Sequence, residues 1–163
     1  MSGPAGAAAV AVCAAAHRLR LLLAAACLAA SAAAGAADTP TPTDLPDLSP
    51  IRAKIYSRDY HGAVGDLRAL SATVQHADLY NLLGFSLRNL EQYDEAAKWY
   101  REALYYDPDH RNAIEYQGEL FIKTGHLQRA RNNLLKLELL CPAGCEERSL
   151  LEQAIAKAED EAG

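Results

Sequence analysis

Two cysteines, Cys141 and Cys145, flank a Pro-Ala-Gly turn and are the residues with the clearest chemical potential in this sequence. Three turn residues can bring two Cα atoms within bonding range, so the pair could form a disulfide. A redox-active pair is a second interpretation, because Cys145 stands at an expected helix start. The spacing is C-x3-C, however, and thioredoxin-like sites use C-x2-C within a βαβ pattern. The sequence therefore favours a structural disulfide over two free thiols, and both over redox catalysis.

Histidines and carboxylates show no catalytic or metal-binding spacing. Four histidines follow position 37, and each lies near an expected helix junction: His61, His76, His110 and His126. None has H-x3-H or H-E-x-x-H spacing. Zinc sites usually need four ligands, and His126 is the nearest histidine to the cysteine pair. There is also no G-x-S-x-G motif and no phosphate-binding loop. We predict no enzyme activity, no metal and no cofactor.

The first 37 residues are typical of a secretory signal peptide. They hold 18 alanines and no acidic residue, and Arg18 and Arg20 precede an apolar run over 21–34. Small residues then lead to an A-x-A-like exit, which predicts cleavage after Ala36 or Ala37. An uncleaved anchor helix is one alternative. Lipoprotein processing at Cys27 is another, but Leu23 stands four residues before that cysteine where three are usual.

The remaining chain has a different composition. After position 37 it carries 14 basic and 21 acidic residues, a balance that argues against non-specific binding to nucleic acid or to an anionic membrane. After the leader, no strongly apolar run reaches the length of a bilayer-spanning helix, so we expect no membrane span in the mature chain. Residues 38–49 begin a segment with four prolines in 13 positions, which predicts an extended, disordered tether.

Helical periodicity dominates from Pro50 onward. Apolar residues recur at spacings of three and four, and turn signals separate these periodic stretches at helix-length intervals. No period-two pattern indicates a strand. We predict an all-α fold with seven helices at about 50–58, 60–72, 77–89, 93–106, 111–123, 127–140 and 145–160.

An internal repeat organises these helices. A spacing of 34 positions separates the members of three pairs of identical residues: Gly84 and Gly118, Ala96 and Ala130, and Pro108 and Pro142. Together with Tyr80, Leu83 and Tyr100, these positions resemble the signature of the tetratricopeptide repeat (TPR). The resemblance implies a helix-turn-helix solenoid with a degenerate repeat at 50–76, full repeats at 77–110 and 111–144, and a capping helix and tail at 145–163.

The second full repeat departs from the pattern at two positions, with Gln117 in place of leucine and Leu137 in place of a small residue. In both repeats we expect Gly84 and Gly118 to lie where the first helix of a pair crosses the second. A side chain at either position would hold the two helices apart.

TPR arrays bind peptides or partner proteins in a concave groove lined by the first helices. The resemblance places eight residues in this groove: Asn81, Phe85, Arg88, Asn89, Glu115, Glu119, Ile122 and Lys123. The subset of TPR proteins that grips C-terminal carboxylates has several basic and amide residues there. Because Glu115 and Glu119 occupy two such places, we expect instead a partner segment with basic and apolar groups.

The resulting hypothesis is a non-enzymatic protein–protein interaction module. The leader and the resemblance together suggest a periplasmic adaptor or assembly factor in a bacterium. One alternative is a structural accessory subunit of a cell-envelope complex. The other is a thiol redox or metal-handling protein that uses Cys141 and Cys145.

Overall fold

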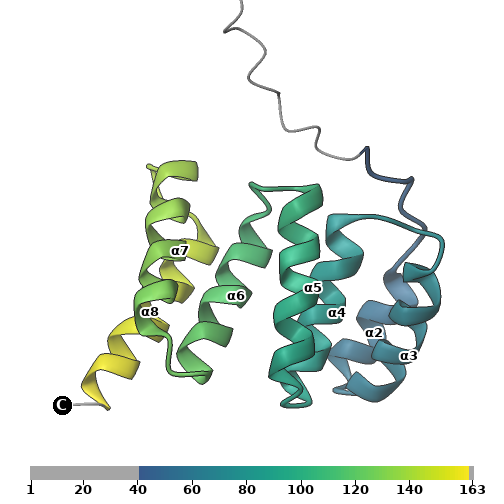
Figure 1. Cartoon of the computed structure of the whole chain (residues 1–163), viewed down its shortest axis with the longest axis horizontal. Helices are drawn as coiled ribbons and strands as arrows, with labels where there is room; N and C mark the ends of the chain where they lie inside the picture. The colour runs from purple at the N-terminus through teal and green to yellow at the C-terminus, as the bar shows by residue number, and fades with distance from the viewer. Residues whose placement is uncertain (1–40, 162–163) are drawn as a thin grey trace, which may run out of the picture. The chain divides into compact units, whose positions relative to one another are not determined.

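The computed structural model describes residues 41–161, and within them every regular element is an α-helix (Figure 1). The helices are α2 (Ser49–Tyr56), α3 (Tyr60–Ser71), α4 (Ala77–Asn89), α5 (Tyr93–Tyr106), α6 (Arg111–Lys123), α7 (Leu127–Leu140) and α8 (Glu146–Asp160). This arrangement confirms the prediction of an all-α fold with seven helices. The signal-peptide residues lie outside the described range.

Local chemistry explains where the helices begin and end. Pro50 occupies the first turn of α2, where its missing N–H costs nothing. His76 and His110 occupy equivalent positions in the two full repeats and cap α4 and α6: each Nδ1 accepts a backbone N–H at 3.1 Å. Gly125 and Gly144 take positive φ values of 76° and 97° in the turns after α6 and α7. His76 and His110 therefore have capping roles, whereas His126 precedes α7 without a side-chain cap and His61 lies inside α3.

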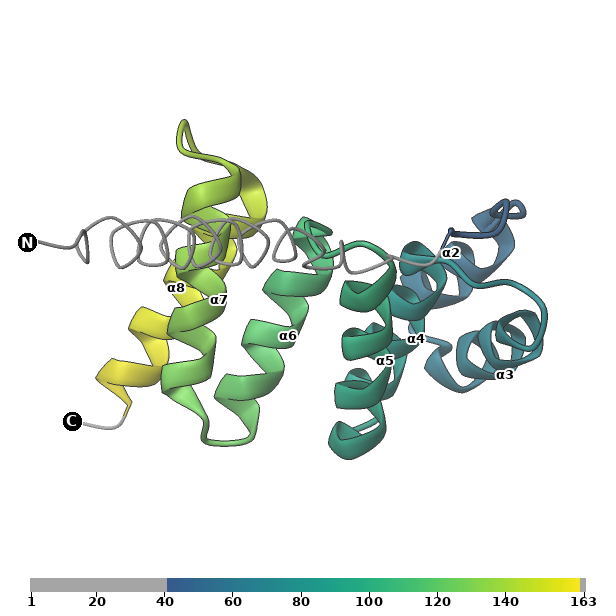
Figure 2. The same ribbon diagram turned by 45° about the horizontal axis from the view of Figure 1, so that its top comes forward.

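The helices stack in sequence order as antiparallel pairs, as Figures 1 and 2 show from two directions. Helix α4 pairs with α5 and α6 pairs with α7, while α4 also contacts α6 and α6 contacts α8. No comparable contact joins α5 to α7 within the described residues. The first helices thus approach one another more closely than the second helices do. We call the surface formed by α4, α6 and α8 the concave face, and the surface formed by α5 and α7 the convex face.

Two apolar clusters fill the space between the helices. The larger extends from Leu48 to Leu120 and includes the fully buried Tyr100. The smaller joins α6, α7 and α8 through residues such as Phe121, Leu137 and Leu151. Leu104 packs against both clusters. The array therefore has two cores that meet near the junction of α5 and α6.

Glycine permits close packing in each full repeat, but against different partners. A Cβ on Gly84 would lie 2.8 Å from the ring of Tyr100 on α5, so this glycine faces its paired helix as expected. A Cβ on Gly118 would lie 2.7 Å from the methyl groups of Leu151, which belongs to α8. The closest approach at Gly118 therefore differs from the expectation, because it comes from α8 and not from the paired helix α7.

The proline-rich segment before α2 packs onto the first helices, contrary to the expectation of a disordered tether. Over 41–48 it has no helix or strand. Yet Leu48 is buried, and Leu45 packs against the larger cluster. The backbone N–H of Thr43 also donates to the carbonyl oxygen of Gln75 at 2.9 Å, just before α4. Two leucines spaced among the prolines supply the apolar contacts that hold this segment in place.

Within residues 41–161, no helix is both long enough and apolar enough to cross a bilayer.

Candidate partner-binding groove

The eight predicted groove residues all lie on α4 and α6, and the structure separates them by exposure. Asn81 and Glu115 are buried, Asn89 and Lys123 are exposed, and the other four are half-buried. An open groove of about 400 Å³ collects four of the eight: Arg88, Glu119, Ile122 and Lys123. The remaining wall comes from α8.

Helix α8 contributes half of the groove lining, which the sequence alone did not reveal. Three of these lining residues, Ala154, Lys157 and Ala158, lie on α8, and the fourth, Glu161, is the C-cap of that helix. Ala154 and Ala158 are one turn apart and form a shallow apolar surface opposite Ile122. The available signal was the apolar spacing of Leu150, Leu151, Ala154, Ile155 and Ala158 along this helix.

Arg88 and Glu119 form the central ion pair of the concave face. The Arg88 Nη1 donates to Glu119 Oε2, and the arginine side chain is only 12% exposed against 33% for the glutamate. The guanidinium carbon also lies 5.5 Å from the ring centre of Phe85 and 5.3 Å from that of Tyr116. Packing between two aromatic rings positions Arg88, so this residue belongs to the framework of the groove as much as to its surface.

Glu115 lies beneath this pair and is almost fully buried. Only 1% of the residue is exposed, and Oε2 has no hydrogen-bond partner. Burial raises its pKa to about 8, and the negative charge of Glu119 adds to the rise while Arg88 opposes it. At neutral pH Glu115 is therefore mainly protonated and uncharged.

Three other side-chain atoms within residues 41–161 are also buried without a hydrogen-bond partner. They are Asn81 Oδ1, Arg88 Nε and the hydroxyl oxygen of Tyr100. Burial raises the pKa of Tyr100 far above its usual value, so the phenol remains neutral. A set of unsatisfied polar groups under a groove costs stability, since each lost hydrogen bond leaves its desolvation uncompensated.

Asn133 compensates for the departure of Gln117 from the repeat pattern. Gln117 is buried at the position where leucine is usual. From α7, Asn133 Nδ2 donates to Gln117 Oε1 at 3.1 Å and to the carbonyl oxygen of Ile114 at 2.8 Å. The polar substitution on α6 is thus matched by a polar partner on the facing helix.

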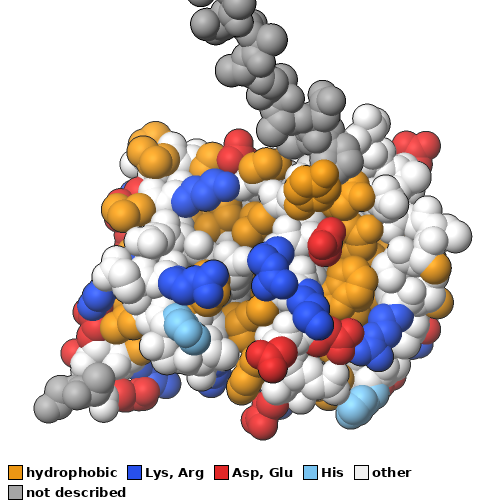
Figure 3. Space-filling model, viewed as in Figure 1, with side chains coloured by type: hydrophobic (Ala, Val, Ile, Leu, Met, Phe, Trp, Pro, Cys, Tyr) orange, Lys and Arg blue, Asp and Glu red, His pale blue; other side chains and the backbone are white. Residues whose placement is uncertain are grey.

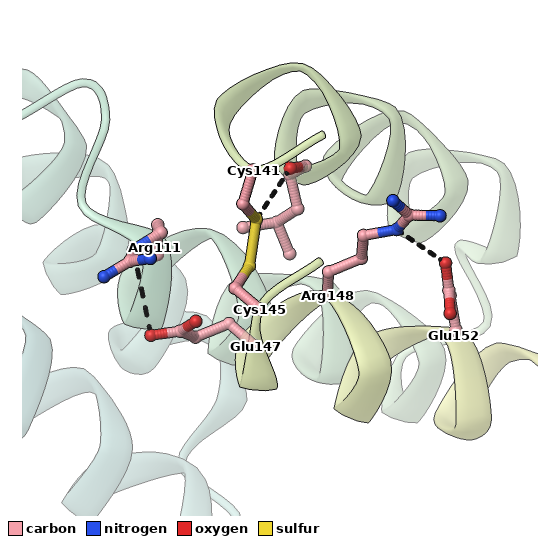
Figure 4. The surroundings of a disulfide bond; sticks show 7 residues. Arg111, Cys141, Cys145, Glu147, Arg148 and Glu152 are labelled. Carbon is pink, nitrogen blue, oxygen red and sulfur yellow. Dashed lines mark hydrogen bonds and ion pairs between the residues drawn. A yellow bond between two sulfur atoms is a disulfide. The ribbon is translucent and has the colours of Figure 1, made fainter. Parts of the chain in front are cut away.

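The cysteine turn, drawn in Figure 4, directly precedes the first residue of α8, whereas the groove residues belong to the other end of that helix. In the structure, the Sγ atoms of Cys141 and Cys145 are 2.03 Å apart and their Cα atoms are 5.9 Å apart. Arg111 and Glu147 form an ion pair at 3.9 Å beside the turn. Within residues 41–161, no group of three or more His, Cys, Asp or Glu side chains has an arrangement that could hold a metal ion.

A second hollow, of about 490 Å³, opens at the N-terminal ends of α4 and α6. Its lining includes His76, Asp78 and His110, and His110 Nε2 lies 3.1 Å from Asp78 Oδ1. Both histidines use Nδ1 to cap helices. His76, Asp78 and His110 therefore have structural partners.

Comparison with known proteins identifies the repeat. A model of the tetratricopeptide repeat family matches residues 77–110. A relative, the uncharacterized protein ycf37 of Guillardia theta, is 33% identical over 61 residues. That match covers 37% of this chain and 34% of the relative, so the chain spans about a third of the length of the relative.

Two solved structures share the fold. One is the second TPR domain of human RPAP3 in complex with the HSP70 peptide SGPTIEEVD, with a TM-score of 0.59 at 20% identity over 68% of this chain and 89% of that one. The other is PcrH in complex with the chaperone binding region of PopD, with a TM-score of 0.59 at 18% identity over 69% of this chain and 85% of that one. At these identities, the likeness establishes the fold.

Proposed function

We propose that this chain, a tetratricopeptide-repeat protein with a helical solenoid fold, is an exported adaptor or assembly factor that binds a segment of a partner protein on its concave face. The observation that carries the proposal is the open groove lined jointly by α4, α6 and α8. Its volume of about 400 Å³ is within the range of ligand-binding clefts. The two similar structures support it, because each contains a bound peptide or protein segment.

Site-specific photo-crosslinking tests this proposal. A photoreactive amino acid at Ile122 lies within the groove, whereas one at Tyr105 lies on the convex face with 58% of the native side chain exposed. In cells of the source organism, we expect a covalent adduct with one partner protein from position 122 and none from position 105. Adducts from position 105 alone would place the binding surface elsewhere.

The location proposed for this protein is the bacterial periplasm. The leader supports export, and a cysteine pair with the spacing of Cys141 and Cys145 suits an oxidising compartment. The intact mass of protein from an exporting host should correspond to a chain that begins at Ala37 or Asp38. Recovery of the full-length chain would contradict processing by a signal peptidase.

A thiol titration of the same preparation addresses the redox alternative. If the cysteine pair is structural, the native protein should show no free thiol at Cys141 or Cys145, and its partner binding should not depend on reduction. A pair that cycles between thiol and disulfide during activity would instead support the redox-protein hypothesis.

A permanent structural subunit remains a second candidate function because of one feature of α7. Leu135 and Leu139 are one turn apart and are 56% and 83% exposed. Apolar side chains so exposed fit a surface that stays covered in a larger complex. A monomeric, soluble and stable purified chain would argue for the adaptor; aggregation relieved by Leu135→Lys and Leu139→Lys would argue for the subunit.

A further inference from the structure

The charges available to a partner in the groove differ from those that the sequence suggests. The expectation of a basic partner segment treated Glu115 and Glu119 as exposed groove carboxylates. Glu115 is buried and mainly protonated, as its pKa of about 8 indicates. The carboxylate of Glu119 is already paired with Arg88. Neither residue leaves an unbalanced negative charge in the groove.

The remaining groove charges are predominantly positive. Lys123 is exposed and forms no ion pair with any residue in 41–161. Lys157 lies 3.8 Å from Glu161, but both side chains are largely exposed, so solvent screens this pair strongly. With Arg88 and Glu119 included, the lining has three basic and two acidic side chains.

This balance is opposite to that of the chain as a whole, which has 16 basic and 21 acidic residues. The face drawn in Figure 3 mixes basic, acidic and apolar side chains, and no single sign of charge dominates it. A locally positive groove on a net negative protein discriminates by charge: an acidic segment is attracted at the groove and repelled by the rest of the surface.

The apolar part of the groove indicates a second property of the partner segment, which is apolar side chains of its own. Ile122, Ala154 and Ala158 are half-buried and lie on the same two helices as the lysines, α6 and α8. Alanine side chains leave room above them, so a larger apolar side chain from a partner can fill the space. A segment that carries apolar residues next to carboxylates would match both the surface and the charge.

We infer that the groove between α6 and α8 binds an acidic, apolar segment of a partner protein, with Lys123 and Lys157 facing its carboxylates and Ile122, Ala154 and Ala158 contacting its apolar side chains. This inference rests on the proposed function and specifies the chemistry of the partner. It assigns recognition to side-chain carboxylates within a segment, so a free C-terminus is not required.

Selection from a phage-displayed library of random dodecapeptides on the immobilised full chain tests the inference. We expect enrichment of peptides with Asp or Glu beside Leu, Ile, Val or Phe. An enriched peptide, synthesised with an amidated C-terminus, should bind in fluorescence titrations and lose affinity as salt rises. Selection on the Lys123→Glu/Lys157→Glu variant should lose these peptides, and the amidated peptide should bind it at least about fivefold more weakly.

The matched control reverses two charges on the convex face. Lys98 and Arg101 are exposed on α5, so Lys98→Glu/Arg101→Glu changes the net charge equally without altering the groove. Binding to this variant should stay within about twofold of wild type. Equal losses in both variants would overturn the inference, because they would show only a response to net charge.

The outcomes separate this inference from the proposed function. Enrichment of basic, apolar peptides that compete with the partner for crosslinking at position 122 would overturn the acidic preference. The groove would then still be the binding site. Peptides whose binding depends only on the convex residues would overturn both. Peptides that bind solely with a free C-terminal carboxylate would also overturn the inference, since side-chain carboxylates would then contribute nothing.

Discussion

The ring of Tyr100 on α5 lies against the backbone of Gly84 on α4, so close that a Cβ at position 84 would be 2.8 Å from both Cδ1 and Cε1. Tyr100 is completely buried, and its hydroxyl has no hydrogen-bond partner. Full burial leaves the ring no open space into which it could shift to make room. This contact sets the distance between the two helices of the first full repeat.

Gly84→Leu should lower the free energy of unfolding by about 2 kcal/mol or more, because overpacking a closed core costs roughly 1–3 kcal/mol and sometimes more. Gly118→Leu should cost less, since Leu151 is a flexible side chain on the terminal helix. Gly65→Ala is the control: nothing lies within 4 Å of its added Cβ, so it should be neutral or stabilise α3. Urea unfolding of the three variants measures these differences, and equal stability of all three would contradict the close contact at Gly84.

Glu115 should make stability fall as pH rises. Its pKa is about 8 in the folded chain and near 4.5 when unfolded, so between these values the folded state holds a proton that the unfolded state has released. The free energy of unfolding should therefore decrease from about pH 4.5 to pH 8 and then level off. Glu115→Gln keeps a neutral side chain at every pH and should be more stable than wild type at pH 9, by on the order of 1.4 kcal/mol per unit of pKa difference.

Thermal melts at pH 5, 7 and 9 measure this effect. Glu102→Gln on the exposed face of α5 is the control and should leave the pH dependence of wild type unchanged. A stability advantage of Glu115→Gln that is the same at pH 5 and pH 9 would show that Glu115 ionises normally in the folded chain.

Arg88 should be more important for stability with Glu119 present than without it. Arg88→Met leaves Glu119 without its counter-charge beside Glu115, and breaking a largely buried pair costs about 3 kcal/mol. In the Glu119→Leu background, the same Arg88→Met change should cost clearly less. A double-mutant cycle by urea unfolding gives the coupling energy. Additive effects would mean that the pair contributes nothing beyond its separate side chains.

The segment before α2 should contribute to folding stability. Leu48 is 5% exposed, so Leu48→Ala should lower the free energy of unfolding by about 2–4 kcal/mol. Leu139→Ala makes the same chemical change at a residue that is 83% exposed and should have an effect below about 0.5 kcal/mol. A negligible effect at Leu48 would restore the interpretation of residues 41–48 as a disordered tether.

The helices were predictable because the sequence marks their ends locally. Pro50, Gly125 and Gly144 act within a residue or two of a boundary, and the internal repeat presents such signals more than once. Side-chain environment was less predictable because it depends on distant helices. The sequence placed Glu115 and Glu119 alike in the groove, whereas one is buried and the other is paired with Arg88 on a different helix.

The contribution of α8 to the groove was equally hard to predict from the sequence, because it too depends on packing against distant helices. Its apolar stripe indicates that it packs on the array, but the pattern cannot say which residues cover the core and which line a groove. Leu151 and Ile155 are buried, while Ala154 and Ala158 face the groove. The departure of Gln117 from the repeat pattern also has its explanation in the structure, where Asn133 on the facing helix donates a hydrogen bond to it.

The division of the interior into two apolar clusters gives the array a weak point. The cluster shared by α6, α7 and α8 is the smaller, and Leu104 packs against both clusters. In a solenoid each repeat is held only by its neighbours, so local opening follows the weakest junction. Amide protons of α7 and α8 should then exchange with solvent through a partial opening that spares α4 and α5. Since α8 forms one wall of the groove, an occupied groove would join the two halves into a single cooperative unit.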